Sequence, residues 1–101
     1  MIKHIIVWRL QPEAHGNSAA ENARLIKEKL EGLAGRIPGL LKIEVGIDIS
    51  RTGESGDLVL YSEFEDEAAL EVYKAHPDHK AVFPFIAAAR ASRVIVDYVA
   101  V

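Results

Sequence analysis

The spacing of apolar and polar residues along the chain predicts four strands. In residues 40–50 the two kinds alternate, as they do in a strand with one buried and one exposed face. The side chains expected to face inward there are Leu41, Ile43, Val45, Ile47 and Ile49. Residues 2–10, 57–65 and 93–101 are rich in β-branched and aromatic side chains, which also favours strands. A glycine-bearing turn at residues 51–57 should join the second and third strands into a hairpin.

A helix is predicted between the first and second strands. Ser18, followed three residues later by Glu21, has the pattern of a capping box at a helix start. Apolar residues then recur at three- and four-residue steps, so one face of the helix should be buried. That face is predicted to be Ala20, Ala23, Ile26, Leu30, Leu33 and Ile37. Gly35 and the pair Pro38-Gly39 are expected to end the helix.

A second helix should begin at Asp66 and end before Pro77, because a proline pushes the preceding residue out of the helical region. A short helical piece is expected after it. The predicted order is therefore β-α-β-β-α-β in a single domain, residues 1–101. This is an α+β, ferredoxin-like fold with a four-stranded antiparallel sheet and two helices on one face.

The first and last predicted strands are apolar on both faces. A lone sheet of this kind would leave a large apolar patch in water, and such patches usually mark an interface. Two such sheets packed face to face form a dimeric α+β barrel. We therefore expect a homodimer that buries more than about 1,000 Å² in total, with Val7 and Ile95 in the interface.

Composition narrows the possible partners. The chain has 101 residues and a formal net charge of −3, and its scattered basic residues form no positive stripe for nucleic acid or an anionic membrane. It has no cysteine, which excludes disulfides and thiolate metal sites and suits a reducing compartment. The first apolar run, residues 5–8, is too short for a signal peptide or a membrane span. We expect a cytoplasmic protein.

The segment YKAHPDHKAVFPF, residues 73–85, carries the candidate chemistry. His79 should lie near a helix start, where the helix dipole disfavours a charged imidazole and leaves a neutral base. The alternative is a partly exposed surface histidine. Tyr73 shares the apolar helix face of Leu70, so its ring should reach the sheet, either as a core residue or beside a bound carbonyl. His76 is expected to fix the turn between the helices.

His4 lies on the same face of the first strand as Ile6 and Trp8. Taken alone, it is interpreted as a core histidine hydrogen-bonded to a neighbour. The histidines lack HExxH or another metal-ligand spacing, so no transition metal is expected. Four carboxylates near the end of the third strand are interpreted as a solvated helix cap, which leaves weak Mg²⁺ or Ca²⁺ binding open. They are Glu63, Glu65, Asp66 and Glu67.

Three segments resemble the Dabb family of stress-responsive dimeric α/β-barrel domains: IKHIIVWRL, IPGLLKIEVGIDIS and DLVLYSEFEDEAALEVYKAHPDH. The most specific part of the resemblance is a His-Pro-x-His element after a tyrosine-bearing helix, paired with a first-strand histidine. The resemblance implies a two-fold dimer without an organic cofactor. It also implies that His79 is the acid–base residue and that Tyr73 and His4 share its pocket. Pro84 departs from the family pattern and is expected to break or restart the last helix.

These residues lead to three functional hypotheses. The first is a cofactor-free lyase or cyclase acting on a carbonyl compound, similar to a polyketide-cyclising member of the family. In it, His79 removes a proton next to the carbonyl, Tyr73 holds the developing oxyanion and His4 orients the substrate. The second hypothesis is a non-catalytic module that binds a small ligand in the same pocket. The third is a cofactor-independent monooxygenase, which would consume oxygen with a phenolic substrate.

Overall fold

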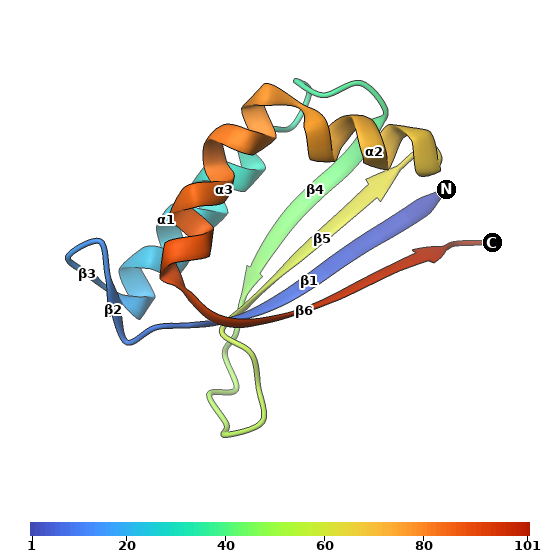
Figure 1. Ribbon diagram of the computed structural model, residues 1–101. Coiled ribbons are helices and arrows are strands. Elements are labelled where there is room, and N and C mark those ends of the chain that lie inside the picture. The colour runs from blue at the N-terminus through green and yellow to red at the C-terminus, as the bar shows by residue number, and fades with distance from the viewer.

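Four long strands form one antiparallel sheet, and three helices lie on the same face of it (Figure 1). The computed structural model describes residues 1–101. The strands are β1 (Ile2–Leu10), β4 (Leu40–Ile47), β5 (Leu58–Phe64) and β6 (Arg90–Val99). The helices are α1 (Ala19–Glu31), α2 (Glu67–Ala75) and α3 (Pro77–Ala89). The sheet order β4-β5-β1-β6 confirms the predicted α+β, ferredoxin-like arrangement.

Two very short strands, β2 (Glu13–Ala14) and β3 (Asn17–Ser18), form a separate small hairpin between β1 and α1. The hairpin is fastened to α1 by Asn22, whose fully buried side-chain amide donates to the Ala14 carbonyl at 2.9 Å. Asn22 lies on the inner face of α1, at a position where helical spacing alone predicts an apolar residue. Its burial there is tolerated because its amide has a hydrogen-bond partner in the hairpin.

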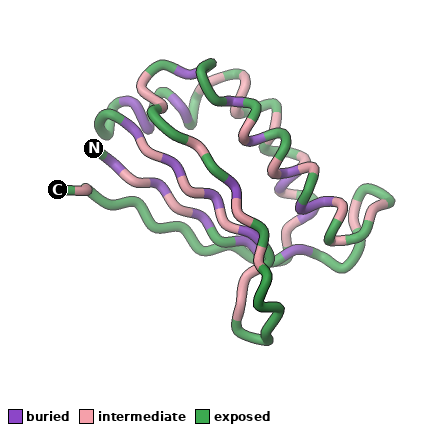
Figure 2. The backbone as a smooth tube through the Cα atoms, turned by 180° about the vertical axis from the view of Figure 1, so that it is seen from behind, coloured by how far each residue is buried: buried purple, intermediate pink, exposed green.

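The hydrophobic core lies between the sheet and the helices. Every second residue of β1 is buried, and residues of intermediate or full exposure alternate with the buried ones (Figure 2). The buried residues of β1 are Ile2, His4, Ile6, Trp8 and Leu10. Helix α1 packs Ile26 and Leu30 against them, and α2 adds Leu70 and Tyr73. The core face of β1 therefore includes a histidine among apolar residues, which is the first sign of a site.

Each helix starts at a capping residue. The Ser18 hydroxyl accepts from the Glu21 amide at 3.2 Å, and the Asp66 carboxylate accepts from the Ala69 amide at 2.8 Å. His76 caps α3, because its Nδ1 accepts from the Asp78 amide at 3.1 Å. These side chains satisfy backbone N–H groups that have no partner inside their helices. The predicted helix starts and the structural role of His76 are confirmed.

The end of α1 differs from the prediction. The helix stops at Glu31, and the backbone N–H of Gly32 closes its last turn, so Leu33 and Ile37 reach the core from a turn that follows the helix. Ala20 is exposed. Leu33 and Ile37 continue the periodic pattern of buried residues because the turn segment packs on the same side of the sheet as α1. Helical spacing alone does not distinguish a longer helix from a helix followed by such a turn.

The inward face of β4 also differs from the prediction. The register against β5 shifts between Leu40 and Lys42, which is a β-bulge. The bulge leaves Leu41 51% exposed, and β4 ends at Ile47, which is 45% exposed. Ile49 lies beyond the strand and is 93% exposed. Only the middle of this alternating segment has the predicted orientation.

Helix α3 is longer than predicted and runs through Pro84 without a break. A proline removes one helical hydrogen bond, here the one to the carbonyl four residues earlier. Ile86 and Ala89, which follow Pro84, are buried in the core, and their packing holds the second half of the helix in place. The last strand then begins at Arg90 rather than at residue 93.

The face of the sheet that the helices do not cover is largely apolar, with the charged side chains of Lys3, Lys42 and Glu63 near Tyr61; we call it the outer face. Its side chains come from alternate positions of the central and edge strands, and include Ile5, Val7, Val59, Tyr61, Val94, Val96 and Tyr98. Strand β6 is exposed along nearly its whole length (Figure 2). Ile95 pairs with Ile6 and faces the helices instead, so its predicted place in an interface is wrong. The assignment failed because both faces of β6 are apolar, and the pattern does not tell them apart.

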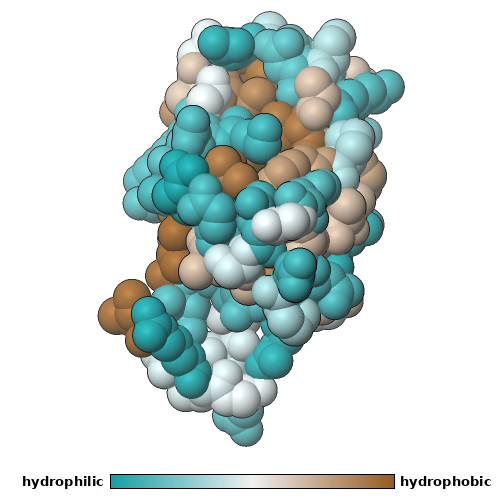
Figure 3. All heavy atoms as spheres, turned by 90° about the vertical axis from the view of Figure 1, so that its left-hand side faces the viewer, coloured by the Kyte–Doolittle hydropathy of each residue, from teal (hydrophilic) through white to brown (hydrophobic).

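The side of the molecule where α1, α3 and the small hairpin lie is mainly polar, with apolar side chains visible between polar ones (Figure 3). No helix is both long enough and apolar enough to span a membrane.

Candidate active site

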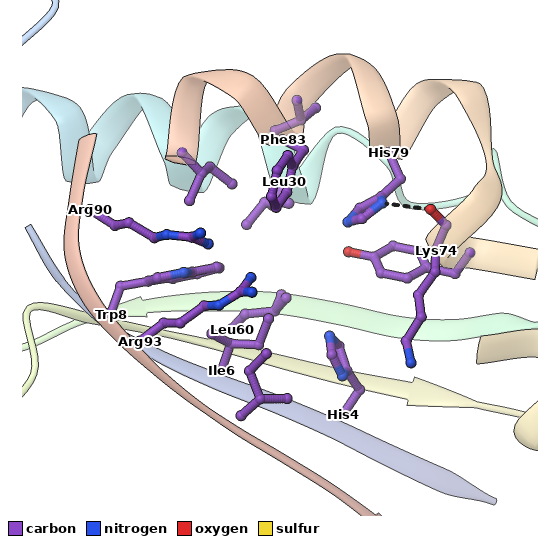
Figure 4. Close-up of a pocket in the computed structure, with 14 residues that line it drawn as sticks. His4, Ile6, Trp8, Leu30, Leu60, Lys74, His79, Phe83, Arg90 and Arg93 are labelled. Carbon is purple, nitrogen blue, oxygen red and sulfur yellow. Dashed lines mark hydrogen bonds between the residues drawn. The ribbon is translucent and has the colours of Figure 1, made fainter. Parts of the chain in front are cut away.

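A cavity of about 180 Å³ lies between the sheet and the helices (Figure 4). Strands β1, β5 and β6 line one side of it, and α1, α2 and α3 line the other. Most of its wall is apolar and includes Ile6, Leu30, Leu60, Val82, Ile86 and Ile95. Its polar groups lie at two ends, with His4, Lys74 and His79 at one and Arg90 and Arg93 at the other. An apolar cavity with a few polar groups is typical of a small-molecule site.

Three elements bring His4, Tyr73 and His79 to this cavity. His4 faces the helices from β1, Tyr73 lies in the last turn of α2, and His79 lies in the first turn of α3. The ring centroids of Tyr73 and His79 are 4.3 Å apart, and those of Tyr73 and His4 are 6.1 Å apart. All three residues selected from the sequence therefore meet in one place.

The surroundings of His79 favour the neutral form of its imidazole. Its Nδ1 lies 3.4 Å from the Lys74 carbonyl (Figure 4). Since a carbonyl only accepts, Nδ1 carries the proton and Nε2 keeps its lone pair. Burial lowers the pKa of His79 below its usual value; the contact with the Lys74 carbonyl acts in the opposite direction, and the nearby His4 and His76 again lower it. The main cause of this lowered pKa is desolvation, whereas the sequence pointed to the helix dipole.

Tyr73 is almost fully buried, with 1% of its surface exposed, and its hydroxyl has no hydrogen-bond partner within the chain. Burial raises the pKa of this phenol, so the hydroxyl stays protonated and is available as a donor. A buried hydroxyl without a partner destabilises a fold by about 1–3 kcal/mol. An unpaired donor beside a cavity that also holds a neutral base is the arrangement expected where a ligand oxygen binds.

His4 has a partner that the sequence analysis did not identify. Its Nδ1 is hydrogen-bonded to the Asp97 carboxylate, which comes from the paired position on β6. The buried Ser62 hydroxyl donates to the backbone carbonyl of His4 at 3.0 Å. The carboxylate fixes the orientation of the ring, and Nε2 is left without a partner in the chain. The available signal was an acidic residue within the apolar strand segment RVIVDYV.

No three histidine, aspartate or glutamate side chains lie together so that they could hold a metal ion. The carboxylates near the end of β5 have separate roles. Glu63 accepts from the Tyr61 hydroxyl at 2.5 Å, and Asp66 caps α2. The cavity contains no glycine-rich turn at a helix start of the kind that holds the phosphates of a nucleotide cofactor.

The fold and the cavity define a small ferredoxin-like α+β protein with a pocket between sheet and helices. The family model of the stress responsive A/B barrel domain, Dabb, matches residues 2–100. The chain belongs to this family. No curated protein is similar enough to count as a match.

Several solved structures are similar over nearly the whole chain. A dimeric ferredoxin-like protein of unknown function from Bacteroides fragilis is 33% identical with a TM-score of 0.84, covering 96% of this chain and 93% of its own. An antibiotic biosynthesis monooxygenase is 25% identical with a TM-score of 0.73, over 100% and 99%. The hydroxynitrile lyase of Passiflora edulis is 15% identical with a TM-score of 0.80, over 96% and 90%, and shares the fold alone. One fold thus serves different reactions.

Proposed function

We propose that the protein is a cofactor-free cyclase or lyase that removes a proton next to a carbonyl group. The convergence of His79, Tyr73 and His4 on one apolar cavity carries this proposal. The cavity provides an imidazole whose pKa is lowered by burial, an unpaired buried donor and an oriented second imidazole. General acid–base catalysis of enolate chemistry needs these three kinds of group within reach of one substrate.

The proposed reaction begins at the Nε2 atom of His79. This nitrogen takes a proton from the carbon next to the carbonyl, and the electron pair of the broken C–H bond forms the enolate. The Tyr73 hydroxyl donates a hydrogen bond to the enolate oxygen. The His4 ring, held in place by Asp97, orients the substrate in the cavity. The enolate carbon then forms a bond with a second carbonyl carbon of the same molecule. The resulting alkoxide takes back the proton from His79.

The test is a screen of linear β-polyketides and other activated carbonyl compounds, first by the shift in melting temperature and then by turnover. For His79→Ala we expect turnover to fall about 100-fold or more, the usual scale for a positioned acid–base group. Tyr73→Phe should reduce turnover while it preserves the ring packing. His76→Ala is the matched control, because His76 caps α3 and does not line the cavity.

If His79→Ala and Tyr73→Phe both turn over at the wild-type rate, the proposed mechanism fails. If compounds bind but the wild-type protein converts none of them, the chain is a binding module. A monooxygenase remains a second candidate, because the similar antibiotic biosynthesis monooxygenase has a TM-score of 0.73. Oxygen consumption with phenolic substrates would identify that reaction.

We further propose that two copies pair through their outer faces. The dimeric state of the Bacteroides fragilis protein supports this assembly, and so do the exposed apolar residues of β6. Val94, Val96 and Tyr98 are 64%, 52% and 42% exposed in the single chain. Sedimentation analysis should give the mass of a dimer, and a stable monomer at micromolar concentration would overturn this assignment.

A further inference from the structure

The end of the cavity away from His79 contains two arginines that a backbone irregularity brings to one face. Residues three apart on a regular strand face opposite sides of the sheet. Between Arg90 and Arg93, however, the pairing with β1 shifts: Arg9 pairs with Ser92, and Leu10 pairs with Arg90. The shift is a bulge, and it aims both guanidinium groups into the cavity (Figure 4).

Neither of these guanidinium groups has an anionic partner in the chain. The four lysine and arginine ion pairs of the protein and the His4–Asp97 contact involve other residues, and neither group makes a side-chain hydrogen bond. The Phe83 ring lies 5.5 Å from the guanidinium of Arg90. Burial and the charge of Arg93 lower the pKa of Arg90, although arginine keeps its charge in proteins. The chain has 15 acidic residues, yet it leaves this pair of positive charges without one.

Trp8 adds an unpaired donor to the same end. Its ring is 3% exposed and lies between the two arginines in Figure 4. Its Nε1–H group is buried without a hydrogen-bond partner. An indole nitrogen only donates, as a guanidinium does. The side chains of Arg90, Arg93 and Trp8 at this end of the cavity can therefore donate hydrogen bonds but cannot accept them. Two of the three are positively charged, so the group that fits them is a carboxylate, which carries a negative charge and only accepts.

We propose that the Arg90–Arg93 end of the cavity binds the carboxylate of an acidic ligand. His4 and Trp8 mark the two ends of the cavity and are four residues apart on β1. A β-strand rises about 3.3 Å per residue, so their Cα atoms are about 13 Å apart. The apolar wall between them suits a carbon chain. The substrate class is thus a carbonyl compound with a carboxylate several bonds from the reacting carbon. The position of the carbonyl rests on the proposed function, whereas the binding of the carboxylate does not.

The test uses hexanoate and its neutral analogue hexanamide in calorimetric titrations of the intact protein. Hexanoate should bind at least about tenfold more tightly than hexanamide, because hydrogen bonds to a charged group are the stronger kind. Arg90→Gln and Arg93→Gln should each remove most of this preference. His79→Ala is the control that separates the two proposals, since it should retain the preference even though it removes the base.

Equal binding of the two compounds, or no binding of hexanoate at millimolar concentration, would overturn the proposal. So would a preference that survives in both arginine variants. Inorganic phosphate that binds more tightly than hexanoate would show that the site is built for a different anion. If Arg90→Gln does not fold, Arg93→Gln decides, because Arg93 is exposed on an edge strand.

Discussion

The two faces of the sheet use the same strands for different purposes. The helix-covered face buries large side chains but also includes polar groups, and two of these, His4 and Tyr73, line the cavity. The outer face is uncovered and largely apolar, and no histidine lines the hollow near Val7 and Val59. A buried polar group lowers the stability of a core unless it is paired, so the unpaired Tyr73 hydroxyl beside the cavity is the feature of the first face that points to a ligand. The apolar surface of the second face indicates assembly.

The largest effect is expected from Phe64→Ala on the helix-covered face. Phe64 is fully buried and packs against the ring of Tyr73 at a centroid distance of 5.0 Å. Its loss should lower the free energy of unfolding by about 3–5 kcal/mol, as measured by urea denaturation. Val72→Ala is the control, because Val72 is 47% exposed on α2. A loss below about 1 kcal/mol for Phe64→Ala would show that this face is not closely packed.

The next effect concerns assembly through the outer face. Val96→Asp should weaken the proposed dimer at least about 100-fold, which corresponds to about 2.7 kcal/mol, because it buries an unpaired charge between two copies. Since Val96 is 52% exposed in the single chain, the monomer should still fold. Sedimentation at several concentrations measures the change. Val72→Asp makes the same change outside this face and should leave the dimer intact; equal behaviour of the two variants would contradict the assignment.

A smaller effect should appear in the pH dependence of the helix-covered face. The folded state lowers the pKa of His79, chiefly by burial. Below the usual histidine pKa of about 6.5, the unfolded chain therefore binds a proton that the folded chain does not. Stability should be complete above that pH and should fall as the pH is lowered through the depressed pKa. The acidic limb of kcat/KM should likewise lie below about pH 6.5.

Urea midpoints between about pH 5 and pH 8, the range in which a histidine titrates, measure this loss. His79→Gln is the comparison variant, because glutamine does not titrate and should remove the part of the pH dependence that His79 causes. An identical pH profile in the variant would mean that another group is responsible.

The smallest effect is expected for the stability of Tyr73→Phe. The Tyr73 hydroxyl is buried without a partner, so its removal should leave stability unchanged or raise it by up to about 1 kcal/mol. Thermal unfolding in the absence of ligand measures this. Tyr61→Phe is the contrast, since it removes the hydrogen bond to Glu63. A clear loss of stability for Tyr73→Phe would show that the hydroxyl already has a hydrogen-bond partner in the free protein. The unpaired donor would then no longer support a ligand site on the helix-covered face.

Local signals in the sequence were enough for the order of elements and for the helix starts. Ser18, Asp66 and Pro77 act through the residues immediately after them, so their effects can be read without knowledge of the fold. The α+β class and an apolar second face of the sheet could also be predicted from the sequence. Successive side chains of a strand point to opposite faces, so the residue types at alternate positions show whether one or both faces are apolar. That His4, Tyr73 and His79 share a pocket could be predicted from the sequence largely through the family resemblance.

Other features depended on contacts between distant segments. The continuous path of α3 through Pro84 and the exposure of Leu41 follow from packing and from a bulge in strand pairing. The partnership of His4 with Asp97 joins residues 93 positions apart.

The sequence by itself determined the element order, the helix caps and the amount of apolar surface to be buried, because these depend on short-range spacing. Only the tertiary structure decided which side chains share the cavity. It aligned Arg90 with Arg93 through a bulge in β6, turned Ile95 toward the helices and left the Trp8 and Tyr73 donors unpaired. The physical reason is that strand register and bulges depend on pairing between distant segments, and a shift of one residue changes the face on which a side chain lies.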